Sequence, residues 1–230
     1  MVTADVSRGD STDFSTFHVM DIESCVQVAE YKGKLSPKEF GNVLVGIASE
    51  YNDALLVVEN ANIGWSTIEQ ILEREYKNMY YSSTSNQDTV ESYMSKYERE
   101  KLVPGFTMSM KTRPLVVAKM MEYIREKAVT VQSKRLLLEM RVFVWKNGKA
   151  QAQINYNDDL VMAFATSLYV RDTALRLRQQ GLDLARAQLS SFSNLNAKNQ
   201  AVISTVGSYQ NNPYLIDMGG QQKEDISWLF

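Results

Sequence analysis

Cysteine and histidine, which form many metal-binding and catalytic sites, are nearly absent from this chain of 230 residues. It contains a single cysteine, Cys25, and a single histidine, His18. One cysteine excludes an internal disulfide framework and any CxxC metal site. One histidine excludes zinc chemistry that needs several imidazole ligands. We therefore expect a protein of a reducing, cytoplasmic compartment, with any metal chemistry resting on oxygen ligands.

Long apolar runs are missing as well. No stretch approaches the ~20 apolar residues that a membrane-spanning helix needs, and the first ten residues lack the apolar region of a secretory signal. Four prolines and eleven glycines are too few for a collagen-like or low-complexity chain. With 44% hydrophobic and 23% charged residues, the composition is that of a globular protein with a sizeable core and no membrane partner.

The net charge of −2 conceals an uneven distribution. Residues 111–149 contain ten basic and three acidic residues, a net charge of +7, so the rest of the chain carries −9. A basic segment beside acidic ones suits a protein that binds a polyanion at one place and metal cations at another. The alternative is a helix and a hairpin whose lysines and arginines are simply solvated.

Strand and helix signals alternate along the chain. The expected strands, rich in β-branched and aromatic residues, are 2–6, 14–22, 25–31, 54–58 and 79–82. The expected helices, with apolar residues at helical spacing, are 36–51, 66–76, 114–129 and 157–180. Asn147-Gly148 between two strand-like runs predicts a hairpin over 141–154. This order predicts an α/β, RNase H-like fold: a mixed five-stranded sheet flanked by helices, with an added β-hairpin.

The expected domain covers residues 1–180. Residues 181–230 are rich in serine, asparagine and glutamine, and we expect them to form a loosely attached helical or irregular tail, with a candidate helix at 182–189. The polar segment 83–105 gives no clear signal. The apolar cluster at 226–230 is a candidate docking peptide for a partner, because such a cluster is costly to leave exposed.

Acidic residues stand at the ends of the expected elements. Asp5 ends the first apolar strand, where a carboxylate is costly unless it is paired or bound to a metal. Glu59 follows the most apolar strand, at the edge of the sheet where ligand sites gather. Asp158 and Asp159 open the last expected helix. Oxygen-only clusters select hard cations such as Mg²⁺ or Mn²⁺, and two such ions can support phosphodiester hydrolysis.

Most of these acids also have an ordinary structural interpretation. Asp10 and Asp13, in the loop after the first expected strand, are typical turn residues. Asp158 is a typical helix cap. Glu59 can be a surface acid at the end of a strand. Asp5 is the hardest to interpret in this way, because the strand around it is apolar.

Three acidic segments and one basic segment carry a family resemblance. Thr3–Asp10, Val57–Asn62 and Asn157–Ala163, together with Gly105-Phe106 and Lys111–Pro114, resemble the nuclease domain of tailed-bacteriophage large terminase subunits. The resemblance is greatest to the terminases of large contractile-tailed phages. It extends from residue 1 to about residue 175, roughly three quarters of the chain.

The resemblance implies a metal-dependent endodeoxyribonuclease that cuts concatemeric double-stranded DNA during packaging in the host cell cytoplasm. It implies catalytic roles for Asp5, Glu59 and Asp159, with Asp13 and Asp158 as further metal ligands, and two Mg²⁺ or Mn²⁺ ions. Asp5 would serve both ions, Glu59 one and Asp159 the other. The family often has a histidine before the aspartate pair, where this chain has an asparagine. That departure leaves open which aspartate binds metal, and we favour Asp159.

The basic segment supplies the expected DNA contacts. Lysine and arginine side chains mainly contact the phosphates of DNA. The affinity for DNA should therefore fall steeply as the salt concentration rises and depend little on the base sequence. The best candidates, Lys111 and Arg113, lie within the resembling segment. The full expected set is Lys111, Arg113, Lys119, Lys134, Arg135, Lys146 and Lys149.

Large terminase subunits also carry an ATPase domain, but this chain has no GxxxxGK[ST] phosphate loop. We therefore expect an excised domain or a fragment from a split gene, which would not translocate DNA by itself. The resemblance implies the ATPase domain, the small terminase subunit and the portal protein as partners. Two other functions stay open. One is a non-catalytic module that docks DNA or the portal, and the other is a Holliday-junction-resolvase-like nuclease that prefers branched DNA.

Overall fold

The computed structural model describes residues 1–10, 13–61, 63–83, 89–90, 102–146, 148–206, 215–217 and 223–225. Within these ranges the chain divides into two units, residues 1–179 and 180–230. The second unit contains the continuation of the last helix and the short antiparallel pair β10 (Leu215–Asp217) and β11 (Lys223–Asp225). The described part contains no helix that is both long and apolar enough to cross a membrane.

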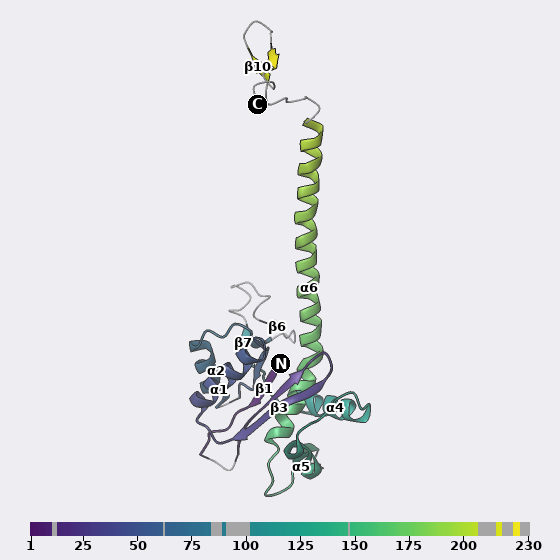
Figure 1. The fold of residues 1–230 in the computed structure, drawn as a ribbon. Coiled ribbons are helices and arrows are strands. Elements are labelled where there is room, and N and C mark those ends of the chain that lie inside the picture. The colour runs from purple at the N-terminus through teal and green to yellow at the C-terminus, as the bar shows by residue number, and fades with distance from the viewer. Residues whose placement is uncertain are drawn as a thin grey trace. The chain divides into compact units, whose positions relative to one another are not determined.

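A mixed sheet of four strands, in the order β3-β2-β1-β4, lies at the centre of the first unit (Figure 1). These strands are β1 (Val2–Asp5), β2 (Ser15–Asp21), β3 (Val26–Gly33) and β4 (Leu56–Val58). The first three form the predicted antiparallel meander. β4 then pairs parallel with β1, so the carboxyl ends of β1 and β4 lie at the same edge.

The expected fifth strand is present but is joined only loosely to this sheet. β5 (Tyr80–Ser83) pairs with β6 (Thr89–Val90) and β7 (Leu102–Pro104) in a separate three-stranded sheet. One parallel bridge between Leu56 and Met79, and a hydrogen bond of 2.9 Å from the Leu56 amide to the Asn78 carbonyl, connect it to β4. The predicted hairpin forms as β8 (Phe143–Lys146) and β9 (Lys149–Ala152).

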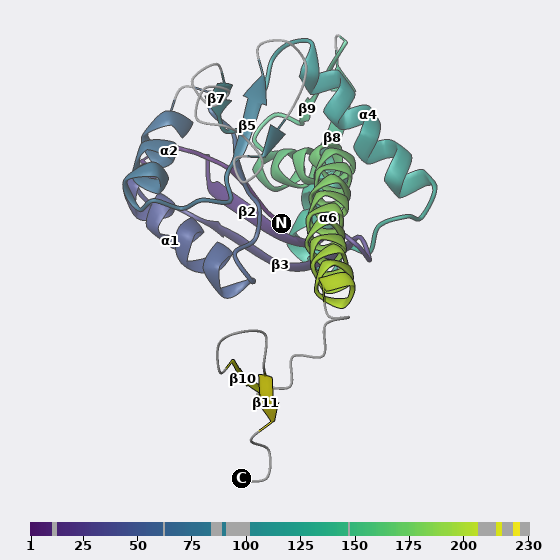
Figure 2. The same cartoon turned by 90° about the horizontal axis from the view of Figure 1, so that it is seen from above.

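Helices cover both faces of the central sheet (Figure 2). α1 (Pro37–Glu50) and α2 (Gly64–Glu73) pack on one face, where Leu56 and Val58 of β4 point. A capping box formed by Ser36 and Glu39 starts α1. The other face, to which Val57 points, is covered by α4 (Thr112–Arg125), α5 (Lys134–Val142) and the first part of α6 (Asp159–Val206). The mixed α/β architecture predicted from the sequence is confirmed.

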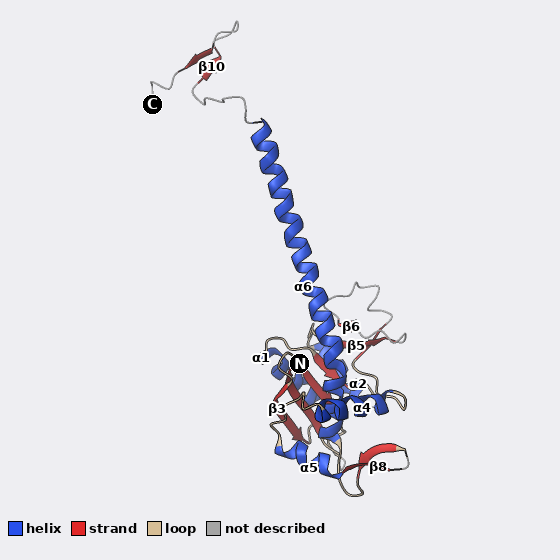
Figure 3. Cartoon of the chain, turned by 90° about the vertical axis from the view of Figure 1, so that its right-hand side faces the viewer, coloured by secondary structure: helices blue, strands red, loops and turns tan. Residues whose placement is uncertain are grey.

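Several boundaries differ from the predictions. α5 was not predicted, because it has only nine residues and its three consecutive leucines do not by themselves show helical spacing. α6 does not end near residue 180 but continues to Val206 as one helix (Figure 3), since an isolated glycine at 181 does not stop a helix. Part of the expected tail is therefore helical, and the candidate docking peptide 226–230 lies outside the described residues.

Two helices bury only part of their apolar residues. α2 begins two residues earlier than expected, and its Leu72 is 40% exposed. In α4, Met121 and Ile124 are exposed, whereas Val116 and Tyr123 are buried. In both helices the buried stripe is narrower than the set of apolar residues at helical spacing.

Candidate functional site

Asp5 and Glu59 meet at the edge where two parallel strands end. Asp5 is the last residue of β1, and Glu59 follows β4 directly. Ala4 and Val58 are partners in the parallel register, and the Glu59 amide donates to the Ala4 carbonyl at 3.2 Å. Because neighbouring parallel strands end at the same edge, the two acids, 54 positions apart in sequence, become neighbours.

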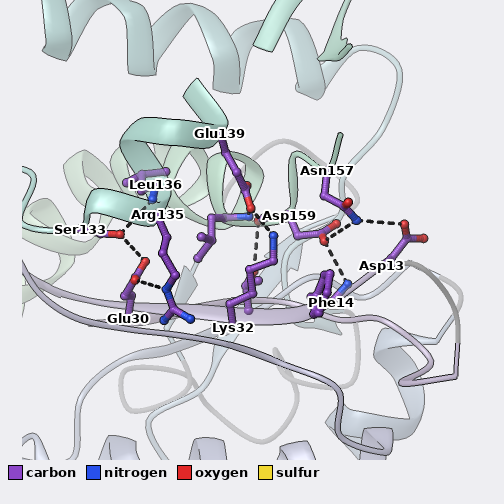
Figure 4. Close-up of polar contacts among 12 residues, drawn as sticks. Asp13, Phe14, Glu30, Lys32, Ser133, Arg135, Leu136, Glu139, Asn157 and Asp159 are labelled. Atoms are coloured by element: carbon purple, nitrogen blue, oxygen red, sulfur yellow. Dashed lines mark hydrogen bonds and ion pairs between the residues drawn. The ribbon is translucent and has the colours of Figure 1, made fainter. Parts of the chain in front are cut away.

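The first turn of α6 brings Asp159 to the same edge (Figure 4). The carboxylate of Asp159 accepts the Phe14 amide at 3.0 Å, and its carbonyl accepts the Thr16 hydroxyl at 3.0 Å. Thr16 is the register partner of Asp5 across β1 and β2. The Asn157 side-chain amide donates to the Asp159 carboxylate at 3.3 Å and to Asp13 at 3.5 Å. These contacts join the start of α6 to β2 and to the residues just before it.

Four of the five predicted metal ligands line one cavity of about 280 Å³. These are Asp5, Asp13, Glu59 and Asp159, and the remaining lining residues are Val6, Ser7, Arg8, Phe14, Ala61 and Ile63. We refer to this cavity as the carboxylate pocket. Gly64 allows α2 to begin beside it, because a Cβ at that position would lie 1.8 Å from the Glu59 carbonyl oxygen.

The acids in the carboxylate pocket are costly to ionise. Burial raises the pKa of Asp5 well above its usual value, and the charges of Glu59, Asp159 and Asp158 raise it further. Burial also raises the pKa of Glu59, although the Arg113 guanidinium opposes this. Burial raises the pKa of Asp159 to about 6, against the hydrogen bond from the Phe14 amide. A bound cation would relieve both the burial cost and the mutual repulsion.

The chemistry of this donor set fits a hard divalent cation. The candidate ligands are all oxygens, as Mg²⁺ and Mn²⁺ prefer. Among the residues that the structure describes, however, no three acidic, histidine or cysteine side chains are already gathered as a ligand set.

Asp158, the fifth predicted ligand, makes a different contact. The Arg113 guanidinium binds its carboxylate at 2.7 Å and also donates to the Ala150 carbonyl at 3.2 and 3.3 Å. The Asp158 carbonyl accepts the Met162 amide at 2.8 Å, as the residue before a helix does. Asp158 thus links the start of α6 to α4 and to the hairpin, whereas Asp159 faces the carboxylate pocket.

Three of the predicted DNA-binding cations form ion pairs with acidic side chains. Arg113 is held by Asp158, Lys119 pairs with Asp172 at 3.0 Å, and Arg135 pairs with Glu30 at 2.7 Å. The exposed members of the set are Lys111, Lys134, Arg135, Lys146 and Lys149. Lys149 also lines a second cavity, of about 550 Å³, with Arg113, Met110, Pro114 and Trp145 among its other lining residues.

Sequence reasoning missed three charged residues around the carboxylate pocket. Arg8 lines it, three positions after Asp5, and this spacing could have drawn attention to it. Lys32 and Glu139 pair with each other, and Glu139 accepts the Leu160 amide at 3.0 Å. These two residues are 107 positions apart, so no local pattern connects them.

The single histidine supports the fold rather than the site. His18 is fully buried, with Nε2 3.0 Å from the Leu160 carbonyl and Nδ1 2.8 Å from the Gln27 side-chain amide nitrogen. The Gln27 amide oxygen accepts the Ser133 amide at 2.9 Å, so its nitrogen faces His18 as the donor. Nε2 therefore carries the proton. Burial lowers the pKa of His18 to about 4, and the ring is neutral at pH 7.

Comparison with known proteins identifies relatives in structure only. No protein-family model and no curated protein sequence matches the chain. The crystal structure of the large terminase nuclease from thermophilic phage G20c with bound magnesium matches at a TM-score of 0.55 and 15% identity, covering 73% of this chain and 79% of that one. The cobalt-bound structure of the same nuclease gives a TM-score of 0.54 at 15% identity, with the same coverage.

A third structure of the G20c nuclease matches at a TM-score of 0.52 and 16% identity, covering 71% of this chain and 77% of that one. At such low identity these matches establish the fold. The chain has the fold of phage large terminase nucleases, and the RNase H-like architecture predicted from the sequence is confirmed.

Proposed function

We propose that this chain is the nuclease domain of a phage large terminase subunit, an endodeoxyribonuclease that cuts concatemeric double-stranded DNA during packaging. A fold alone supports many functions, so the proposal rests on the site. The observation that carries it is the carboxylate pocket, where Asp5, Glu59 and Asp159 converge from three separate segments. The same three segments carry the family resemblance, and the structural neighbours include a nuclease crystallised with magnesium and with cobalt.

The proposed metal ligands are the acids of the pocket. Asp5, Glu59 and Asp159 would hold the divalent ions, with Asp5 serving both, Asp13 as an additional ligand and Asp158 in a supporting role. When bound, Mg²⁺ or Mn²⁺ supplies an activated water and stabilises the leaving oxygen of a phosphodiester.

Neighbouring residues hold these acids in place and balance their negative charge. The Phe14 amide fixes one oxygen of Asp159, and Asn157 connects Asp159 with Asp13. Arg8 brings a positive charge to a cavity that otherwise repels a DNA phosphate. We assign it to the scissile strand, in addition to the predicted cations of the basic segment.

The proposal extends to the partners that such a domain needs. We assign residues 1–180 to the nuclease domain and the remainder to a tail that meets other packaging components. Those components are the terminase ATPase domain, the small terminase subunit and the portal protein, in the host cell cytoplasm. The sequence has no phosphate loop, so ATP-driven translocation is assigned to the ATPase domain.

A non-catalytic module that docks DNA or the portal is the second candidate. One observation favours it: the described residues contain no ligand set already gathered for a metal. Calorimetric titration with Mn²⁺ separates the two functions. The nuclease should bind Mn²⁺ at millimolar concentrations or below, and Asp5→Asn should abolish binding. A folded wild type that does not bind Mn²⁺ would favour the docking module.

Competition between a four-way junction and a linear duplex tests the resolvase-like alternative. A packaging nuclease acts on linear concatemers, so we expect no preference for the junction. Strong preference for the junction would assign the same acids to a resolvase-like enzyme.

A further inference from the structure

Glu139 lies on α5 and reaches the first turn of α6, next to Asp159 (Figure 4). One of its carboxylate oxygens accepts the Leu160 amide at 3.0 Å, and the other binds the Lys32 ammonium group. The side chains of Glu139 and Lys32 are only 11% and 17% exposed. Neither residue lines the pocket.

The contact with Leu160 is a helix cap supplied from a distant part of the chain. The first amides of a helix have no partner within it, and a carboxylate there also interacts favourably with the helix dipole. In α6 one of these amides, next to Asp159, is satisfied by an acid on another helix, 21 positions earlier in sequence.

Lys32 links Glu139 to Phe14, on the other side of Asp159. It extends from β3, and its ammonium group lies 4.6 Å from the centre of the Phe14 ring. The Phe14 amide in turn donates to the Asp159 carboxylate. The pair of Lys32 and Glu139 thus contacts both neighbours of Asp159, the α6 backbone through Leu160 and the start of β2 through Phe14.

We propose that Glu139, paired with Lys32, is a positioning residue that fixes the first turn of α6 and thereby holds the Asp159 carboxylate at the pocket. This inference rests on the proposed function, since it gives Asp159 a ligand that must be held in place. Thr16 and His18 contact carbonyl oxygens of the same turn, and the Phe14 amide and the Asn157 side chain contact the Asp159 carboxylate. Glu139 holds an amide, and no other described contact replaces it.

A matched pair of variants separates this role from simple stabilisation. Glu139→Leu removes the cap and the ion pair, and Glu139→Gln keeps an acceptor for the Leu160 amide. Glu30→Gln is the control, because Glu30 also joins β3 to α5, through Arg135 at 2.7 Å and Ser133 at 2.5 Å. It weakens a link between the same two elements without touching α6.

The first measurement is amide hydrogen exchange of the full chain without divalent ions. Glu139→Leu should speed exchange in residues 160–164 at least tenfold, whereas Glu139→Gln should have a smaller effect and Glu30→Gln none. The second measurement is Mn²⁺ affinity by calorimetry. Loss of a residue that orients a metal ligand typically costs about 10- to 100-fold in affinity, and we expect at least tenfold for Glu139→Leu and less than twofold for Glu30→Gln.

The two measurements distinguish failure of this inference from failure of the proposed function. Unchanged exchange in 160–164, or faster exchange with unchanged Mn²⁺ affinity, would overturn the positioning role. A wild type that binds no Mn²⁺ would overturn the proposed function and the positioning role with it, whatever the exchange data. If Glu139→Leu does not fold, Glu139→Gln and Lys32→Met carry the same test, with at least threefold losses of affinity expected.

Discussion

Replacing Asp159 with asparagine should make the protein more stable at neutral pH when no divalent ion is present. Burial raises the pKa of this carboxyl from 3.8 to about 6, so its charge costs more in the native state than in the unfolded chain. Two pKa units correspond to about 3 kcal/mol. The side chain is partly exposed, and an anion is favourable in the first turn of a helix. We therefore expect a net gain of about 1–2 kcal/mol.

The gain should depend on pH in a defined direction. Above about pH 6 the carboxyl is ionised in both states, and the full penalty on the native state is present. As the pH falls from about 6 toward 3.8, the native carboxyl takes up a proton that the unfolded chain does not yet bind, and the penalty disappears. The difference between wild type and Asp159→Asn should therefore be largest above pH 7 and close to zero near pH 4.

Urea-induced unfolding in EDTA, at pH 7.5 and pH 4, measures both parts of this prediction. Asp10→Asn is the control, because the Asp10 side chain is 74% exposed and its replacement should change stability by less than about 0.5 kcal/mol. If Asp159→Asn is less stable than wild type at pH 7.5, or gains equally at both pH values, the electrostatic account of the pocket is refuted.

Metal binding, DNA binding and packing each provide one more prediction. Mn²⁺ at about 100 times its Kd should stabilise the wild type by about 2.7 kcal/mol in thermal denaturation, and an equal response from Asp5→Asn would exclude Asp5 as a ligand. Charge reversal of Lys146 and Lys149 should weaken DNA binding on unrelated sequences alike and reduce the salt slope by about 2 in fluorescence anisotropy; an unchanged slope would remove the hairpin from the interface. Leu136→Ala should cost about 2–5 kcal/mol in urea unfolding because Leu136 is fully buried, and a similar loss for the half-exposed Leu137→Ala would contradict the assigned packing of α5.

The sheet and its edge could be predicted because their signals are local. An apolar run of strand length ending at Glu59, and a meander before it, place the acid at the end of a buried strand. The capping box at Ser36 and the Asn147-Gly148 turn are likewise signals of a few residues. Asp5 was informative for a related reason, since a carboxylate in an apolar strand needs a partner.

The parts that escaped prediction depend on contacts between distant segments. α5 has only nine residues, and its run of three leucines does not distinguish a helix from a strand. The link between Lys32 and Glu139 depends on how α5 packs against β3. The sequence left open which of two adjacent aspartates binds metal, although we favoured Asp159. The difference between them depends on Arg113, which pairs with Asp158 from another helix. The spacing of apolar residues shows which face of a helix or strand is apolar. It does not show which other element packs against that face.

Cleavage of supercoiled plasmid by the full chain, with Mg²⁺, Mn²⁺ or EDTA and beside Asp5→Asn, tests the central claim most directly. The nuclease assignment predicts nicking and linearisation that require the divalent ion and disappear in the variant, since Asp5 is the acid proposed to serve both ions. No cleavage with either ion by folded wild type would contradict this account. Cleavage that persists in Asp5→Asn would contradict it equally.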